Sequence, residues 1–189
     1  MIGVVAEFHN GKLLVASPAL TDDNFARSVI YLCMYNEEGA FGLILNRPLP
    51  QESVAERLPE WSHAASEPGL LFRGGPVHPT AGAALARISG PTPRDGWTPL
   101  FRNVGMFALE RPPSEPFFDL TALRIFSGYS GWTGGQLDSE VNDGGWFVVD
   151  AEAGDLFTPE PETLWRRTLQ RQDGPLAMFA HFPVDPRAN

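Results

Sequence analysis

The stretch RSVIYLCMYNEEGAFGLILN, residues 27–46, constrains the fold of this chain more than any other. Its first part, 27–35, is a nearly continuous run of apolar, β-branched and aromatic residues, which is typical of a strand buried on both faces. A turn over 36–39 follows, in which Gly39 can adopt the positive φ that such turns need, and a second apolar segment covers 40–46. This pattern predicts a buried β-hairpin.

The rest of the chain predicts more short elements of the same kind. Gly (19) and Pro (18) make up about a fifth of the 189 residues, against roughly 12% on average, which favours strands and turns over a helical bundle. We expect one α+β domain over residues 1–189, in which strands dominate. A strand that runs into a Pro turn is predicted over 11–20, and further strands at 69–74, 83–88, 101–109, 122–128 and 145–151. A loop is predicted at 112–116, and helices at 51–58 and 161–172.

Charge and apolar content argue against two classes of partner. The net charge is −9 and Lys12 is the only lysine, whereas nucleic-acid binders present a basic stripe to the phosphates. No apolar run reaches the roughly 20 residues of a transmembrane helix, and the N-terminus lacks the basic region of a signal peptide. The lone Cys33 excludes an internal disulfide and fits a reducing compartment. We therefore expect a cytoplasmic protein that binds neither nucleic acid nor a membrane.

The residue types that carry most enzyme chemistry form no constellation here. His9, His63, His78 and His181 lie far apart, and none belongs to a metal-ligand spacing. Cys33 stands within an apolar run, where a buried and inert thiol is expected. The sequence thus predicts no metal, no cofactor and no catalytic residue.

The glycine-rich segment FSGYSGWTGGQLDSEV, residues 126–141, allows two interpretations. One is a loop that holds a ligand. The other is a capped turn, in which Thr133 and Gln136 form a capping box and Trp132 packs against Leu137 as a hydrophobic staple. We favour the capped turn, because the segment matches neither a phosphate-binding loop nor a nucleophile elbow. The turn gives no role to Tyr129 or Glu140, so the ligand-binding interpretation stays open.

Two other tight turns, NRP (46–48) and RGGPV (73–77), also place an arginine beside Gly or Pro. Because tight turns after apolar strands gather at the ends of a sheet, we expect both turns to meet the glycine-rich segment on one side of the sheet. The residues predicted to bind a ligand or partner there are Asn46, Arg47, Arg73, Gly74, Gly75, Tyr129, Gln136 and Glu140.

Together these motifs resemble the YqgE/AlgH family of small bacterial proteins, described as candidate transcriptional regulators. The resemblance covers about residues 11–172 and rests on GKLLVASPAL, NFARSVIYLCMYNEEGAFGLILNRPL, FRGGPV, GYSGWTGGQLDSEVNDGGWF and TLWRRTL. It implies a mixed α+β fold whose bifurcated sheet curls into a pseudo-barrel. Tyr35 stands where relatives often have a histidine, so a shared histidine-based catalytic role does not extend to this chain.

These observations favour a cytoplasmic regulatory or interaction protein without catalysis, whose partner is an unknown protein or a small polar ligand. No helix-turn-helix is apparent, so any effect on transcription is expected to be indirect. One alternative is an enzyme of unknown reaction, with a cleft formed by the NRP, GGP and GYSGW turns. A weaker alternative is a regulator that binds DNA directly.

Overall fold

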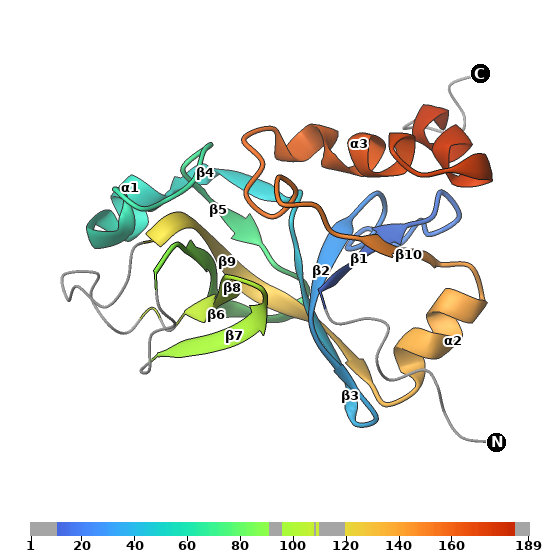
Figure 1. The fold of residues 1–189 in the computed structure, drawn as a ribbon, viewed down its shortest axis with the longest axis horizontal. Coiled ribbons are helices and arrows are strands. Elements are labelled where there is room, and N and C mark those ends of the chain that lie inside the picture. Colours follow the sequence, from blue (N-terminus) through green and yellow to red (C-terminus); the bar gives the residue numbers. More distant parts are fainter. Residues whose placement is uncertain (1–10, 91–95, 108, 110–119, 184–189) are drawn as a thin grey trace.

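The computed structural model describes residues 11–90, 96–107, 109 and 120–183. In this part of the chain, strands predominate and the helices are short (Figure 1). The strands are β1 (Lys12–Ala16), β2 (Val29–Asn36), β3 (Gly39–Ile44), β4 (Pro48–Ser53), β5 (Leu70–Arg73), β6 (Val77–Ile88), β7 (Trp97–Phe101), β8 (Val104–Phe107), β9 (Leu120–Thr133) and β10 (Trp146–Asp150). The α-helices are α1 (Val54–Arg57), α2 (Gln136–Asn142) and α3 (Leu164–Gln170), and 3-10 turns cover Pro59–Trp61, Pro161–Thr163 and Gly174–His181.

The long strand β9 organises the sheet. The main strand order is β10-β1-β2-β3-β9-β6-β8-β7, and these neighbours pair antiparallel. On the edge of β9 that β3 occupies, β5 also pairs with it, in parallel, and β4 pairs with β5. The sheet therefore divides at β9 into two branches and curls into a half-barrel (Figure 1). The expected strand-rich α+β fold is confirmed.

The predicted hairpin is confirmed as β2 and β3, and it is buried on both faces. Alternate residues of β1, β2 and β3 enter two apolar clusters on opposite faces of the sheet. The first cluster includes Leu13, Tyr31 and Leu43 and is covered by α3. The second includes Leu14 and Ile30 and is covered by α2. Both faces of this branch are thus closed by short helices.

Several predicted elements differ from the observed ones. The strand expected over 83–88 begins at Val77, the strand expected over 122–128 continues to Thr133, and the helix expected over 161–172 begins with a 3-10 turn and is α-helical over Leu164–Gln170. The helix expected over 51–58 begins at Val54, because the chain up to Ser53 is held as a strand by β5 and the Ser53 hydroxyl then caps the N–H of Ala55. The strand expected over 101–109 is divided between β7 and β8 by a turn at Arg102, which has φ +55°. The loop expected at 112–116 lies outside the described residues.

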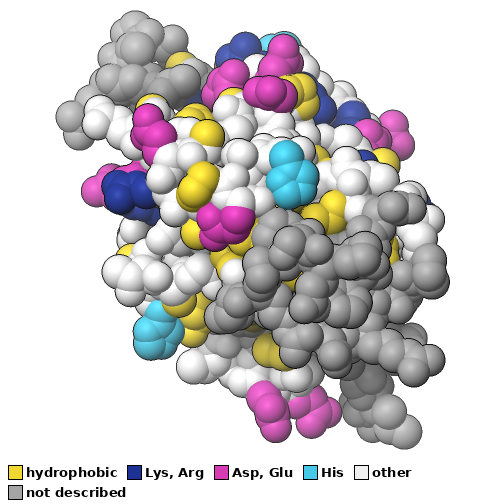
Figure 2. Space-filling view, turned by 90° about the vertical axis from the view of Figure 1, so that its left-hand side faces the viewer, with side chains coloured by type: hydrophobic (Ala, Val, Ile, Leu, Met, Phe, Trp, Pro, Cys, Tyr) yellow, Lys and Arg dark blue, Asp and Glu magenta, His cyan; other side chains and the backbone are white. Residues whose placement is uncertain are grey.

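The distribution of surface charge and the length of the helices bear on which partners the described chain can bind. On the face shown in Figure 2, the visible Lys and Arg side chains are scattered among acidic and apolar ones. Each described helix is too short or too polar to cross a lipid bilayer.

Candidate functional site

The NRP turn begins with Asn46, whose side chain fixes the backbone before β2. Its Oδ1 accepts a hydrogen bond from the Val29 N–H at 2.9 Å, and its Nδ2 donates to the Arg27 carbonyl at 2.9 Å. Arg27 has φ +57°, a left-handed conformation that is uncommon outside glycine. Asn46 therefore holds in place a residue whose backbone conformation is unfavourable by itself.

Arg47 extends this contact to the same segment and to the GGP turn. Its Nη2 donates to the carbonyl of Ala26, and its own carbonyl accepts from the N–H of Arg73 at 2.8 Å. Burial and the positive charge of Arg73 lower the pKa of the Arg47 guanidinium. The NRP and GGP turns thus lie side by side, and they bring two like charges together.

The GGP turn also lies against β9. The Gly74 carbonyl accepts a hydrogen bond from the Ser130 hydroxyl at 3.1 Å. A Cβ atom at Gly74 would lie 2.2 Å from the Gly128 carbonyl oxygen, and one at Gly75 would lie 2.2 Å from the Tyr129 carbonyl carbon. Both glycines are therefore required for this close approach of backbone to backbone.

Tyr129 lies at the edge of the first apolar cluster. Its ring contacts Phe41, with 4.9 Å between ring centroids, and His78, at 5.8 Å. The start of the glycine-rich segment therefore meets the GGP turn through its backbone at Gly128 and Tyr129, while the Tyr129 ring packs on β3 and β6.

Gln136 and Glu140 lie on the opposite face, in a network around the second apolar cluster. The Glu140 Oε2 accepts hydrogen bonds from the indole N–H groups of Trp132 at 2.9 Å and Trp146 at 2.8 Å. Its Oε1 accepts from Gln136 Nε2 at 3.0 Å. The structure does not bring Glu140 and Tyr129 together, and it ties Glu140 to two strands of the core.

The expected capping box at Thr133 is wrong. Strand β9 continues through Thr133, which pairs with Gly39, and the chain turns only at Gly135, the N-cap of α2 with φ +76°. The Thr133 N–H and hydroxyl both donate to Gln136 Oε1, at 3.1 and 3.2 Å. Gln136 thus makes its half of the box, whereas the Thr133 hydroxyl bonds a side chain and leaves the helix backbone uncapped.

A pocket of about 440 Å³ adjoins the NRP turn. It lies between the segment 17–27, Arg47 and the C-terminal residues Phe182 and Pro183, and we call it the arginine pocket. Two guanidinium groups, those of Arg27 and Arg47, line it. Neither forms an ion pair with a carboxylate in the described residues.

Arg27 is held on two sides. Its Nη2 donates to the Phe182 carbonyl at 2.7 Å and also to the Pro183 carbonyl, and its guanidinium lies 4.4 Å from the centre of the Trp165 ring. Burial and the nearby Arg166 lower the pKa of Arg27. Neutral partners thus hold the Arg27 guanidinium in place. The nearby charged group is Arg166, which is also positive.

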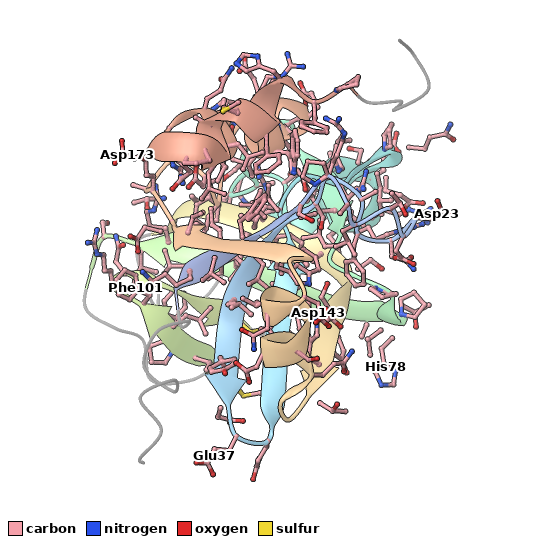
Figure 3. All side chains as sticks on the ribbon, turned by 90° about the vertical axis from the view of Figure 1, so that its right-hand side faces the viewer. Asp23, Glu37, His78, Phe101, Asp143 and Asp173 are labelled. Atoms are coloured by element: carbon pink, nitrogen blue, oxygen red, sulfur yellow. The ribbon has the colours of Figure 1, made fainter. Side chains whose placement is uncertain are left out.

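Three further polar residues, Ser17, Thr21 and Asp23, line the pocket. Ser17 is 4% exposed, and its hydroxyl has no hydrogen-bond partner within the described chain. A buried hydroxyl without a partner is costly, and among the described buried polar groups that lack one, Ser17 is the one that lines the arginine pocket. Asp23, the carboxylate of the lining among the described residues, lies at the outer edge of its loop (Figure 3).

The family assignment follows from a family model described as AlgH-like, which matches residues 13–177. This chain belongs to the AlgH-like family. The UPF0301 protein of Streptomyces coelicolor is 45% identical over 183 residues, covering 95% of this chain and 94% of the relative. A UPF0301 protein of Thermobifida fusca is 42% identical over 193 residues, with the same two coverages.

Solved structures share this fold. A crystal structure of a protein from Corynebacterium diphtheriae is similar with a TM-score of 0.84 and 29% identity, covering 92% of each chain. The solution structure of the AlgH protein from Pseudomonas aeruginosa gives a TM-score of 0.67 and 27% identity, covering 98% of this chain and 100% of that chain. The predicted AlgH resemblance is confirmed.

In this AlgH-like chain, sequence reasoning missed Ser17 and Arg27 as site residues. Both stand at the ends of buried strands, in SPAL and FARS, just as Arg47 stands in NRP. That shared position was the signal available, because polar side chains at strand ends are free to line a pocket. The described residues hold no group of three or more His, Cys, Asp or Glu side chains placed to bind a metal.

Proposed function

We propose that this AlgH-like protein is a cytoplasmic regulatory protein that binds a small anionic ligand in the arginine pocket, without catalysis. One observation carries the proposal: two half-buried guanidinium groups share a pocket without an ion-pair partner among the described residues. Charge that is partly removed from water requires compensation. In a chain with 23 acidic and 14 basic side chains, two arginines left unpaired favour an anion supplied from outside.

The regulatory part rests on the contact between Arg27 and the C-terminal segment. Arg27 holds the carbonyls of Phe182 and Pro183, and Phe182 is 48% exposed while Met178 is 71% exposed. An anion that draws on the same guanidinium changes how this apolar surface is held and presented to a partner protein. The buried Cys33 fits the reducing cytoplasm, and the acidic chain favours an indirect effect on transcription.

The test is a titration of the ¹⁵N-labelled protein with benzoate, phenyl sulfate and phenyl phosphate at constant ionic strength. At least one anion should shift the amide signals of residues 17–27 and 46–47, and Arg47→Gln should weaken that response about ten-fold. Arg57→Gln is the control, because it removes the same charge from an exposed residue that is paired with Glu52. The proposal fails when no anion shifts these signals, or when both variants weaken binding equally.

A further inference from the structure

The charges, size and walls of the arginine pocket define the ligand more closely. We propose that the pocket binds a small organic phosphate monoester, with its phosphate between Arg27 and Arg47 and its organic part against Phe182. This proposal rests on the anion-binding function proposed above and names the chemical class of that anion.

Charge is the first argument for a phosphate monoester. Two guanidinium groups face one pocket, and Arg73 and Arg166 stand close enough to lower the pKa of Arg47 and Arg27. A carboxylate or sulfate ester brings one negative charge, whereas a phosphate monoester brings nearly two at neutral pH. Asp23 is the one carboxylate among the described residues of the lining, so Arg27 and Arg47, with Arg166 and Arg73 beside them, still leave enough positive charge to favour a dianion.

Hydrogen-bond donors are the second argument. Each guanidinium has five N–H donors in a planar fork, and only Nη2 of Arg27 and of Arg47 is engaged within the described residues. The buried Ser17 hydroxyl adds a donor without a partner. A phosphate presents three strong acceptor oxygens, which suits donors that come from three separate side chains.

The volume and the apolar lining of the pocket indicate that the ligand has an organic group besides its phosphate. A volume of about 440 Å³ is far larger than a phosphate ion and falls within the roughly 300–1,000 Å³ of small-molecule sites. Pro18, Leu20, Phe182 and Pro183 give one portion of the lining an apolar character. Phe182 is 48% exposed, so its ring is open to a second apolar or aromatic group.

Isothermal titration calorimetry with three probes tests this class of ligand. Phenyl phosphate, phenyl sulfate and inorganic phosphate are compared at about pH 8, well above the second pKa of a phosphate ester at roughly 6. Phenyl phosphate should bind about ten-fold or more tightly than either other probe, because it alone has both the double charge and the ring.

Three variants locate the two parts of the ligand. Arg47→Lys keeps the charge but removes the fork, and it should weaken the binding of both phosphates. Phe182→Ala should weaken phenyl phosphate and leave inorganic phosphate unchanged, whereas Met178→Ala, an exposed apolar residue outside the pocket lining, should change neither.

Each other outcome contradicts one part of the proposal. Equal affinity for phenyl sulfate and phenyl phosphate would refute the dianion while leaving the anion-binding function intact. Equal affinity for inorganic phosphate and phenyl phosphate, with no effect of Phe182→Ala, would refute the organic part. The absence of binding by all three probes would refute this inference, and the absence of a response to benzoate as well would refute the proposed function.

Discussion

At the scale of the residue, Asn46 shows how one side chain prepares the pocket. Replacing it with Ala leaves the Val29 N–H and the Arg27 carbonyl without their partner, which should lower the free energy of unfolding by about 1–3 kcal/mol. Urea denaturation measures this loss. Asn24→Ala is the matched control, because Asn24 is exposed. Equal midpoints for the two variants would show that Asn46 does not support the Arg27 backbone.

Residues also mark the limit of what the sequence predicts about the site. Asn46 and Arg47 could be selected because polar residues that end a buried strand have a recognisable pattern. The environment of Glu140 could not be predicted from the sequence. Its partners Trp132 and Trp146 come from β9 and β10, and only the tertiary structure brings these strands together. Periodicity specifies which face a residue occupies and carries no information about partners distant in the chain.

At the scale of the element, the entry to α2 gives a second prediction. Gly135→Ala should destabilise the protein by about 1 kcal/mol, because an L-residue is strained at φ +76°. A Cβ atom there has open space, so backbone strain is the sole source of the loss. Thr133→Ala should cost only about 0.5 kcal/mol, because it removes an exposed hydrogen bond between side chains. If Thr133→Ala lowered the free energy of unfolding more than Gly135→Ala does in urea denaturation, the hypothesis that Thr133 caps α2 would regain support.

Element boundaries were predictable where local chemistry decides them. The hairpin of β2 and β3 follows from two apolar runs and a glycine turn, and these signals are local. The boundary between β4 and α1 could not be found in the same way. Residues 51–53 have the composition of a helix, yet pairing with β5 extends the strand to Ser53, and such tertiary pairing overrides propensity.

At the scale of the whole molecule, composition and turn density predicted the α+β class, and the motifs predicted the bifurcated sheet through the family resemblance. The strand order was beyond reach from the residues alone, because β9 takes β3 and β5 on one edge and β6 on the other. These partner strands are far apart along the chain, so no local sequence pattern shows that they pair. The arginine pocket has the same origin, since Phe182 reaches Arg27 across most of the chain.

The central place of β9 leads to the last prediction, on amide hydrogen exchange of the native protein. The amides of Leu123, Ile125 and Phe126 lie in a buried strand that pairs with β6 at all three residues and with β5 at Phe126, and in Figure 1 this strand runs through the middle of the fold. Opening it requires both branches of the sheet to separate, so these amides should exchange only through global unfolding.

Strand β7 provides the internal comparison. Within the described residues it pairs with β8 alone, and Thr98 and Phe101 are exposed, so its amides should exchange through local opening at a much lower free energy. Exchange followed by NMR, with the free energy of unfolding from urea as reference, measures both. Equal protection of β7 and β9 would show that the sheet opens as one unit, and that β9 has no special role in holding its two branches together.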